Sequence, residues 1–147
     1  KQAQFEFENG RIPNVKLLKA RLLFDGAYYQ KALNVMQGIN KEKELNNFRD
    51  SLEFFYRLAR IHHESTNISK SISLYKKTIR MGSDKKYYFA ANSALKLGQI
   101  YENEKEYDKA EFYFEKCTDL DFNEYRRSII REARNGLFRI RNRKGIK

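Results

Sequence analysis

Small and apolar positions recur along this chain at a step of 39 residues, without any gap. One column of the repeat holds mostly small residues, and a second holds large apolar ones. The small column contains Ala20, Ala59, Gly98 and, in the last copy, Leu137. The large column contains Met36, Tyr75 and Phe114. Supersecondary units that stack on their neighbours produce such a pattern, which predicts that Gly98 lies where two helices of one hairpin touch.

The apolar spacing within each copy is that of helices. In the third copy, Tyr88, Ala91 and Leu95 begin a stripe at helical spacing, which predicts a helix over 84–104. Ser83 or Asp84 is its expected N-cap. A polar turn and a second helix over about 107–119 follow. The first copy begins at Pro13 and turns at 25–27, and a last stripe predicts a final helix over 124–142.

These elements predict an all-α fold of tandem antiparallel helical hairpins with a C-terminal capping helix. The expected units are 13–51, 52–90 and 91–123, followed by the cap helix 124–142 and a basic tail at 143–147. Residues 1–12 show no clear period, so an irregular lead-in or the stump of an upstream element is expected there. The chain starts without Met, which favours a fragment of a larger protein; a targeting region would lie upstream, and no compartment is predicted.

The third copy carries a recognisable motif. It reads L-G-x2-Y from Leu97 and A-x3-F from Ala110, which resembles the tetratricopeptide repeat. Ala94 stands where this repeat usually has Trp, and Phe122 stands where it has Pro. The resemblance extends more weakly over residues 13–142.

The resemblance implies a right-handed solenoid whose first helices line a concave face. It also implies a non-enzymatic scaffold that binds a protein or peptide partner on that face. The step of 39 residues exceeds the family's period of about 34. We expect the additional residues to lengthen the first helices, as at 83–88.

Composition gives little support for catalysis. Eleven Phe and ten Tyr residues predict a collapsed core. The sequence contains no apolar run of about 18 residues, the length that a membrane-spanning helix needs, so no membrane span is predicted. His62 and His63 are adjacent and diverge on a helix, so a shared metal is not expected. Cys117 aligns with Ile39 and Thr78, which favours a buried thiol. We therefore expect neither enzymatic activity nor a metal or cofactor.

The net charge of +11 is concentrated at the C-terminus. Residues 124–147 contain nine basic and two acidic residues. One interpretation is a solvated cap helix with a basic tail. The other is a surface for an acidic partner, a membrane surface or nucleic acid. Only Tyr125 and Phe138 interleave with these charges, which makes nucleic acid the weaker choice.

The resemblance also projects a set of basic residues onto the concave face. Its members are Arg21, Arg57, Arg60, Lys96, Arg131 and Arg134. Arg makes bidentate bonds to carboxylates, so an acidic peptide or a C-terminal carboxylate is the expected ligand. Leu17 and Arg21 replace the Lys and Asn of the family's carboxylate clamp, so the chaperone-tail binding of that clamp is not expected.

Three alternatives stay open at this point. The arginines could instead pair with neighbours such as Glu53 and Glu64. The chain could be a basic module for nucleic acid or another polyanion, or a structural or self-assembly array. We expect Arg57 and Lys96 to be exposed, so replacing both by Ala should leave folding nearly intact.

Overall fold

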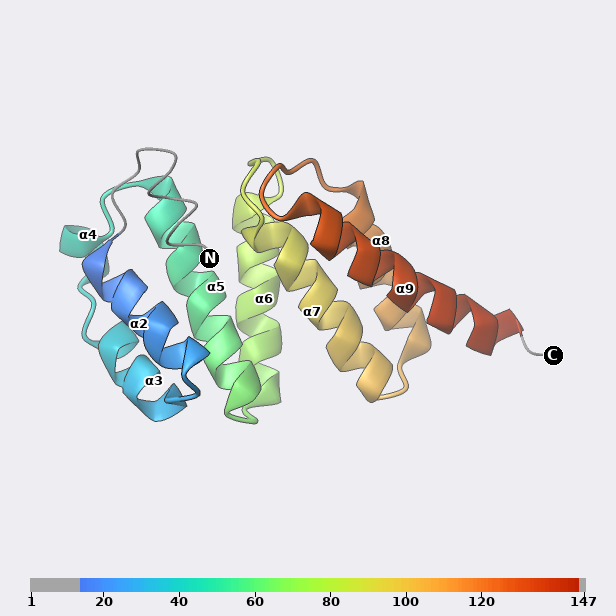
Figure 1. Cartoon of the computed structure of the whole chain (residues 1–147), viewed down its shortest axis with the longest axis horizontal. Helices are drawn as coiled ribbons and strands as arrows, with labels where there is room; N and C mark the ends of the chain where they lie inside the picture. The colour runs from blue at the N-terminus through green and yellow to red at the C-terminus, as the bar shows by residue number, and fades with distance from the viewer. Residues whose placement is uncertain (1–13, 146–147) are drawn as a thin grey trace. The chain divides into compact units, whose positions relative to one another are not determined.

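The computed structural model describes residues 14–145, and within this range the chain forms helices and turns with no strand. The prediction of an all-α fold of helical hairpins is confirmed. The expectation for residues 1–12 lies outside the described residues. The chain divides into two compact units, residues 1–71 and 72–147, and the division falls within α6 (Ile68–Gly82). The helices of both units are labelled in Figure 1.

The first unit packs α2 (Val15–Asp25), α3 (Tyr29–Gln37) and α5 (Phe48–Glu64) against one another, with the short α4 (Lys41–Glu44) between α3 and α5 in sequence. Three Asn residues fix where these helices begin. The side chains of Asn14, Asn40 and Asn47 accept the N–H groups of the third residue beyond each of them, as N-caps do. The apolar core of the unit contains Leu17, Ala20, Phe24, Ala32, Met36, Ile39, Leu45, Phe54 and Ile61.

In the second unit, α7 (Phe89–Asn103), α8 (Tyr107–Asp119) and α9 (Arg126–Gly145) pack pairwise. Phe114 of α8 is fully buried, and glycines of the two other helices face its ring. A Cβ placed on Gly98 of α7 or on Gly136 of α9 would lie 2.6 Å from a carbon of this ring. Gly98 therefore lies at a helix contact, as predicted, and Gly136 is its counterpart on α9.

The turn inside each helical hairpin is built in the same way. In the first, the Tyr28 N–H donates to the Leu23 carbonyl and the Ala27 N–H donates to the Phe24 carbonyl. This pair of bonds is the Schellman motif, which satisfies carbonyls at a helix end and places one residue in the left-handed region. The left-handed residues are Ala27, Thr66 and Lys105, with φ of 66°, 65° and 62°. They are 39 residues apart in sequence, and the same two bonds recur at each.

The additional residues at 83–88 lie in the connection between α6 and α7 and do not lengthen α7, so that prediction is wrong there. Residues 83–88 are turns and bends, and α7 begins only at Phe89. The Ser83 hydroxyl donates to the Ile79 carbonyl and so belongs to the end of α6. Neither Ser83 nor Asp84 is the N-cap. The cap residue is Tyr88, whose N–H donates to the Glu124 carboxylate at 3.3 Å.

Candidate functional site

The six basic residues predicted for the site lie in both units. Arg21 is on α2, and Arg57 and Arg60 are on α5, all in the first unit. Lys96 is on α7, and Arg131 and Arg134 are on α9, in the second. The structure brings together Arg21 with Arg57, at Glu53, and Arg131 with Arg134, along one hollow, whereas Arg60 and Lys96 lie outside these two groups.

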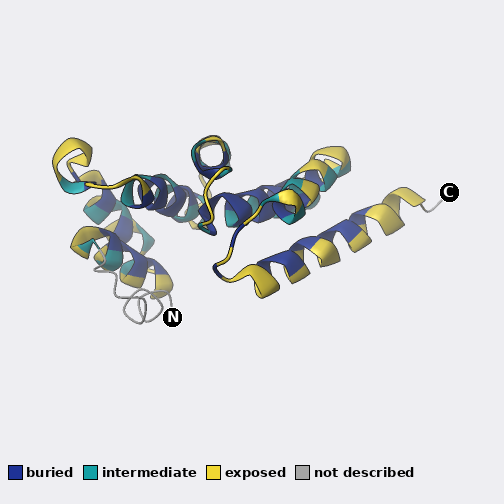
Figure 2. Cartoon of the chain, turned by 90° about the horizontal axis from the view of Figure 1, so that it is seen from above, coloured by how far each residue is buried: buried dark blue, intermediate teal, exposed yellow. Residues whose placement is uncertain are grey.

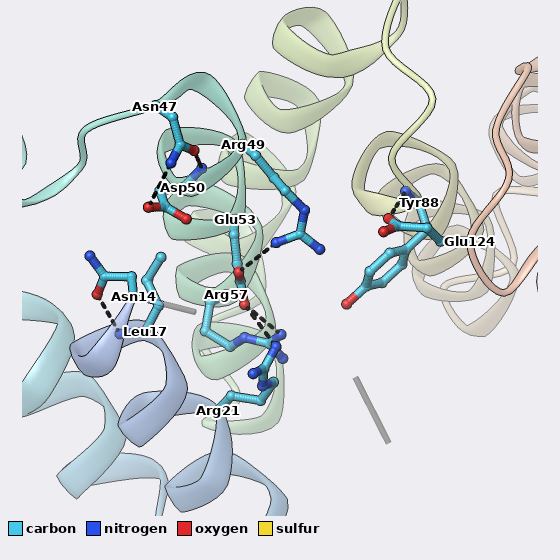
Figure 3. A network of polar contacts seen from close by, with 10 residues as sticks. All are labelled: Asn14, Leu17, Arg21, Asn47, Arg49, Asp50, Glu53, Arg57, Tyr88 and Glu124. Atoms are coloured by element: carbon cyan, nitrogen blue, oxygen red, sulfur yellow. Dashed lines mark hydrogen bonds and ion pairs between the residues drawn. The ribbon is translucent and has the colours of Figure 1, made fainter. Parts of the chain in front are cut away.

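Arg21 and Arg57 meet at one carboxylate in the interior of the first unit. Their guanidinium nitrogens lie 3.4 and 3.3 Å from Glu53 Oε2, and Arg49 lies 3.4 Å from Glu53 Oε1 (Figure 3). All four side chains are at most 6% exposed. The pairing with Glu53 that the sequence left open as an alternative is present in the structure for both residues.

This Glu53 cluster, defined as Arg21, Arg49, Glu53 and Arg57, links α2 to α5. Three guanidinium groups share the Glu53 carboxylate, so Arg21 and Arg49 still face it when Arg57 is removed. The prediction that Arg57 is exposed is wrong, and the argument from exposed ion pairs therefore does not apply to Arg57→Ala. The side chain reaches the unit's interior because positions 49, 53 and 57 follow one face of α5 at i, i+4 spacing.

Arg60 is placed differently from its neighbour Arg57. Its guanidinium donates to the Tyr56 hydroxyl at 3.1 Å and lies 4.9 Å from the centre of the Phe24 ring. The side chain is half-buried. A guanidinium stacked on an aromatic ring keeps its charge while its motion is restricted, which leaves Arg60 suited to a positioned contact with an anion.

In the second unit, Lys96 is half-buried on α7, and the basic residues of α9 fall into two groups. The C-terminal group pairs with acidic residues of the unit. Arg139 binds Glu102 in bidentate fashion at 2.8 and 3.0 Å. Arg141 bonds to Glu111 and Glu115 at 3.1 and 2.7 Å. Lys144 bonds to Glu111 at 2.8 Å and also pairs with Asp108. These charges are therefore used in docking α9 against α7 and α8.

The N-terminal group, which we call the arginine face, consists of Arg126, Arg127, Arg131 and Arg134. With Ile130 and Asn135 these residues line an open hollow of about 600 Å³. All four arginines are exposed. Figure 2 shows that the exposed side of this C-terminal helix lies opposite its buried stripe. Within residues 14–145, Arg127, Arg131 and Arg134 have no carboxylate partner. Arg126 lies over the Phe122 ring, 5.4 Å from its centre.

The titratable residues singled out from the sequence are packed into the interior. Burial, followed by the charge of Lys70, lowers the pKa of His62. Burial, assisted by Glu132, raises the pKa of the Cys117 thiol to about 12. A thiol with such a pKa is not a nucleophile at neutral pH. In the described part of the chain, no group of three His, Cys, Asp or Glu side chains could hold a metal ion. None of the helices described here has the length and apolar character needed to cross a bilayer.

Several residues of these clusters were missed by reasoning from the sequence. Arg49 belongs to the Glu53 cluster, and its i, i+4 spacing to Glu53 is a signal that could have found it. Arg126 and Arg127 belong to the arginine face, but the sequence does not tell them apart from the paired residues Arg139 and Arg141. That distinction depends on which acidic residues of α7 and α8 lie beside α9.

Comparison with known protein families matches residues 91–124 to the tetratricopeptide repeat. This segment covers most of α7 and all of α8 and ends at Glu124. Searches among curated proteins and among solved structures find no match to this chain.

Proposed function

Because residues 91–124 are a tetratricopeptide repeat, we propose that this chain is a non-enzymatic scaffold that holds a protein or peptide partner. The repeat is a protein–protein interaction module, and this observation carries the proposal. The partner would lie on the face formed by the first helices of the hairpins, which is the concave face of this architecture.

We propose an acidic partner, recognised by the basic residues projected onto that face. Arg60, Lys96, Arg131 and Arg134 are the members that would contact it directly, because they lie outside the Glu53 cluster. Arg21 and Arg57 would act through Glu53, by fixing α5 against α2 and so placing Arg60. The support is the charge of these side chains and the half-buried or exposed setting of the four that would make contact.

Selection from a peptide library displayed on phage tests this function. The immobilised target is the whole chain, and each selected peptide is measured by fluorescence anisotropy against the parent and against variants. We expect Arg60→Ala and Lys96→Ala, both on first helices, to weaken binding. The control substitutions are Lys31→Ala on α3 and Lys116→Ala on α8, which remove the same charge from second helices. No selected peptide, or equal losses from the two sets, would contradict the proposal.

A second candidate function is binding of nucleic acid or another polyanion, which the exposed arginines of α9 favour. The two candidates differ in their response to salt. Affinity for a nucleic acid falls steeply with salt concentration, in proportion to the number of phosphates contacted. A peptide held partly by apolar contacts is less affected.

A further inference from the structure

The two halves of α9 carry similar numbers of basic residues but use them differently. The C-terminal half directs Arg139, Arg141 and Lys144 to carboxylates of α7 and α8. The N-terminal half presents the arginine face to solvent around the hollow. Apart from Arg143, which lies over the Tyr107 ring at 5.5 Å from its centre, the arginines of this helix without a carboxylate partner among the described residues lie in its first three turns.

The arginine face has a spacing that suits an extended chain. Arg127, Arg131 and Arg134 are at i, i+4 and i+7, so they follow one side of the helix. At about 1.5 Å of rise per residue, they cover about 10 Å of helix. An extended peptide covers this distance in about three residue steps. Carboxylates on alternate residues of such a peptide point to the same side and are about 7 Å apart, so two of them fit within the length of the three arginines.

We propose that the arginine face of α9 binds an extended acidic segment of the protein partner, with two carboxylates at alternate positions shared among Arg127, Arg131 and Arg134. This inference rests on the proposed function and specifies where its acidic ligand binds. Each guanidinium presents a planar fork of donors that matches a carboxylate. Asn135 offers an amide to the backbone of the segment, and Ile130 gives the hollow an apolar floor.

The lining of the hollow favours a peptide over nucleic acid. Single-stranded nucleic acids bind to surfaces where aromatic side chains stack on the bases, and the six residues that line this hollow include no aromatic ring. A duplex is held by a long series of phosphate contacts. Along α9 that series would end after Arg134, because the next basic residues are already bonded to Glu102, Glu111 and Glu115.

The test uses the whole chain and a fluorescein-labelled peptide in which Glu alternates with Ser. A peptide in which Gln replaces Glu has the same length and serves as the neutral probe. We expect the Glu peptide to bind and the Gln peptide to bind at least about tenfold more weakly. The triple variant Arg127→Ala, Arg131→Ala, Arg134→Ala should lose at least about tenfold in affinity for the Glu peptide.

Two further variants make the result specific. Arg139→Ala combined with Arg141→Ala also removes positive charge from α9, yet binding should stay within about twofold of the parent, because those side chains serve docking of the helix. The variant Arg127→Lys, Arg131→Lys, Arg134→Lys keeps the charge without the planar fork of donors, so its affinity for the Glu peptide should fall between those of the parent and the triple Ala variant. Far-UV circular dichroism and a thermal melt of each variant show that α9 is still folded.

Several outcomes would overturn the inference. If the triple variant binds the Glu peptide as the parent does, the acidic ligand lies elsewhere and the scaffold function remains. If the parent protein binds the Gln peptide as tightly as the Glu peptide, the arginine face does not select carboxylates. A single-stranded oligothymidine and an anionic lipid vesicle are the probes for other polyanions. If the parent binds one of them more tightly than the Glu peptide, and that binding is lost in the triple Ala variant but kept in the Arg139→Ala, Arg141→Ala control, the ligand is another polyanion. Failure of the scaffold function itself appears separately, as a library selection that yields no peptide.

Discussion

Phe114 is the residue on which the packing of the second unit depends most directly. Its ring lies between the backbones of Gly98 and Gly136, which come from two different helices. An aromatic ring held on both sides by glycines has no room to move aside, because protein interiors are packed as densely as organic crystals. The repeat pattern points to the pair formed by Gly98 and Phe114. Gly136 lies one residue before the aligned position Leu137, so the pattern does not find it.

Replacing Gly98 by Ala should lower the free energy of unfolding by roughly 1–2 kcal/mol. The new methyl group would lie 2.6 Å from the Phe114 ring, and overpacking of this kind typically costs about 1–3 kcal/mol. The better helix propensity of Ala offsets up to about 1 kcal/mol. Urea unfolding of parent and variant measures the difference.

Gly145→Ala is the matched control, because no atom lies within 4 Å of a Cβ built there. Its effect should stay within about 0.5 kcal/mol. Combining Gly98→Ala with Phe114→Leu should cost less than the sum of the two single changes, since the smaller side chain makes room for the methyl group. An unchanged urea midpoint for Gly98→Ala would show that the contact with Phe114 is not tight.

At the scale of elements, the hairpin turns carry a recurring local strain. Ala27, Thr66 and Lys105 adopt positive φ, where a Cβ comes too close to the neighbouring carbonyl oxygen. Thr66 is the most unusual of the three because it is β-branched. The Schellman bonds on either side hold each residue in this conformation, since they satisfy carbonyls that the helix end leaves open.

Thr66→Gly should therefore raise the free energy of unfolding by roughly 0.5 kcal/mol. Glycine removes the steric cost of the left-handed conformation, which is about 1–2 kcal/mol. Glycine also raises the conformational entropy of the unfolded chain, which offsets part of this gain in stability. Thermal unfolding of the two proteins provides the measurement. Ser65 has φ of −87°, so Ser65→Gly should instead destabilise the protein. If Thr66→Gly behaved like Ser65→Gly, the left-handed turn would carry no strain.

Helices with a clear apolar stripe were predictable from the sequence, and the connections between them were not. The second helix of the third copy was expected at about 107–119, and α8 runs from Tyr107 to Asp119. The first helix of that copy was expected to begin near 84 but begins at Phe89. Ser83 bonds back to α6, and the N–H of the cap residue Tyr88 donates to the Glu124 carboxylate. A bond between residues so far apart in the chain leaves no local pattern in the sequence.

The burial of the candidate site residues was predictable only in part. Arg21 and Arg57 were expected on an open face, and both are buried at Glu53. Arg131 and Arg134 were expected to be accessible, and both are exposed. Whether an arginine of this chain serves folding or is available to a partner depends on nearby carboxylates, and those are brought close by helix packing over distances that hydrophobic periodicity does not encode.

At the scale of the whole molecule, the net charge of +11 is partly used to dock α9. Hydrogen bonds from Lys144 and then Arg141 lower the pKa of Glu111 below its usual range. The ionised Glu111 side chain is thus more stable in the folded protein than in the unfolded chain. Its contribution to docking is complete above the usual Glu pKa of about 4.3, and it is lost as the pH falls through the lowered value.

We therefore expect acid to release the last turn of α9 before the rest of the helix. Between about pH 6 and about pH 3, backbone NMR shifts of residues 141–145 should move toward coil values, because protonated carboxyl groups no longer hold Arg141 and Lys144. Residues 129–140 should remain helical, since Ile129, Ala133 and Ile140 are held by buried apolar contacts. Glu111→Gln at neutral pH should reproduce part of the change, and NaCl at about 1 M should do so as well by screening the exposed pairs. Unchanged shifts at 141–145 under all three conditions would show that the ion pairs do not dock this end of the helix.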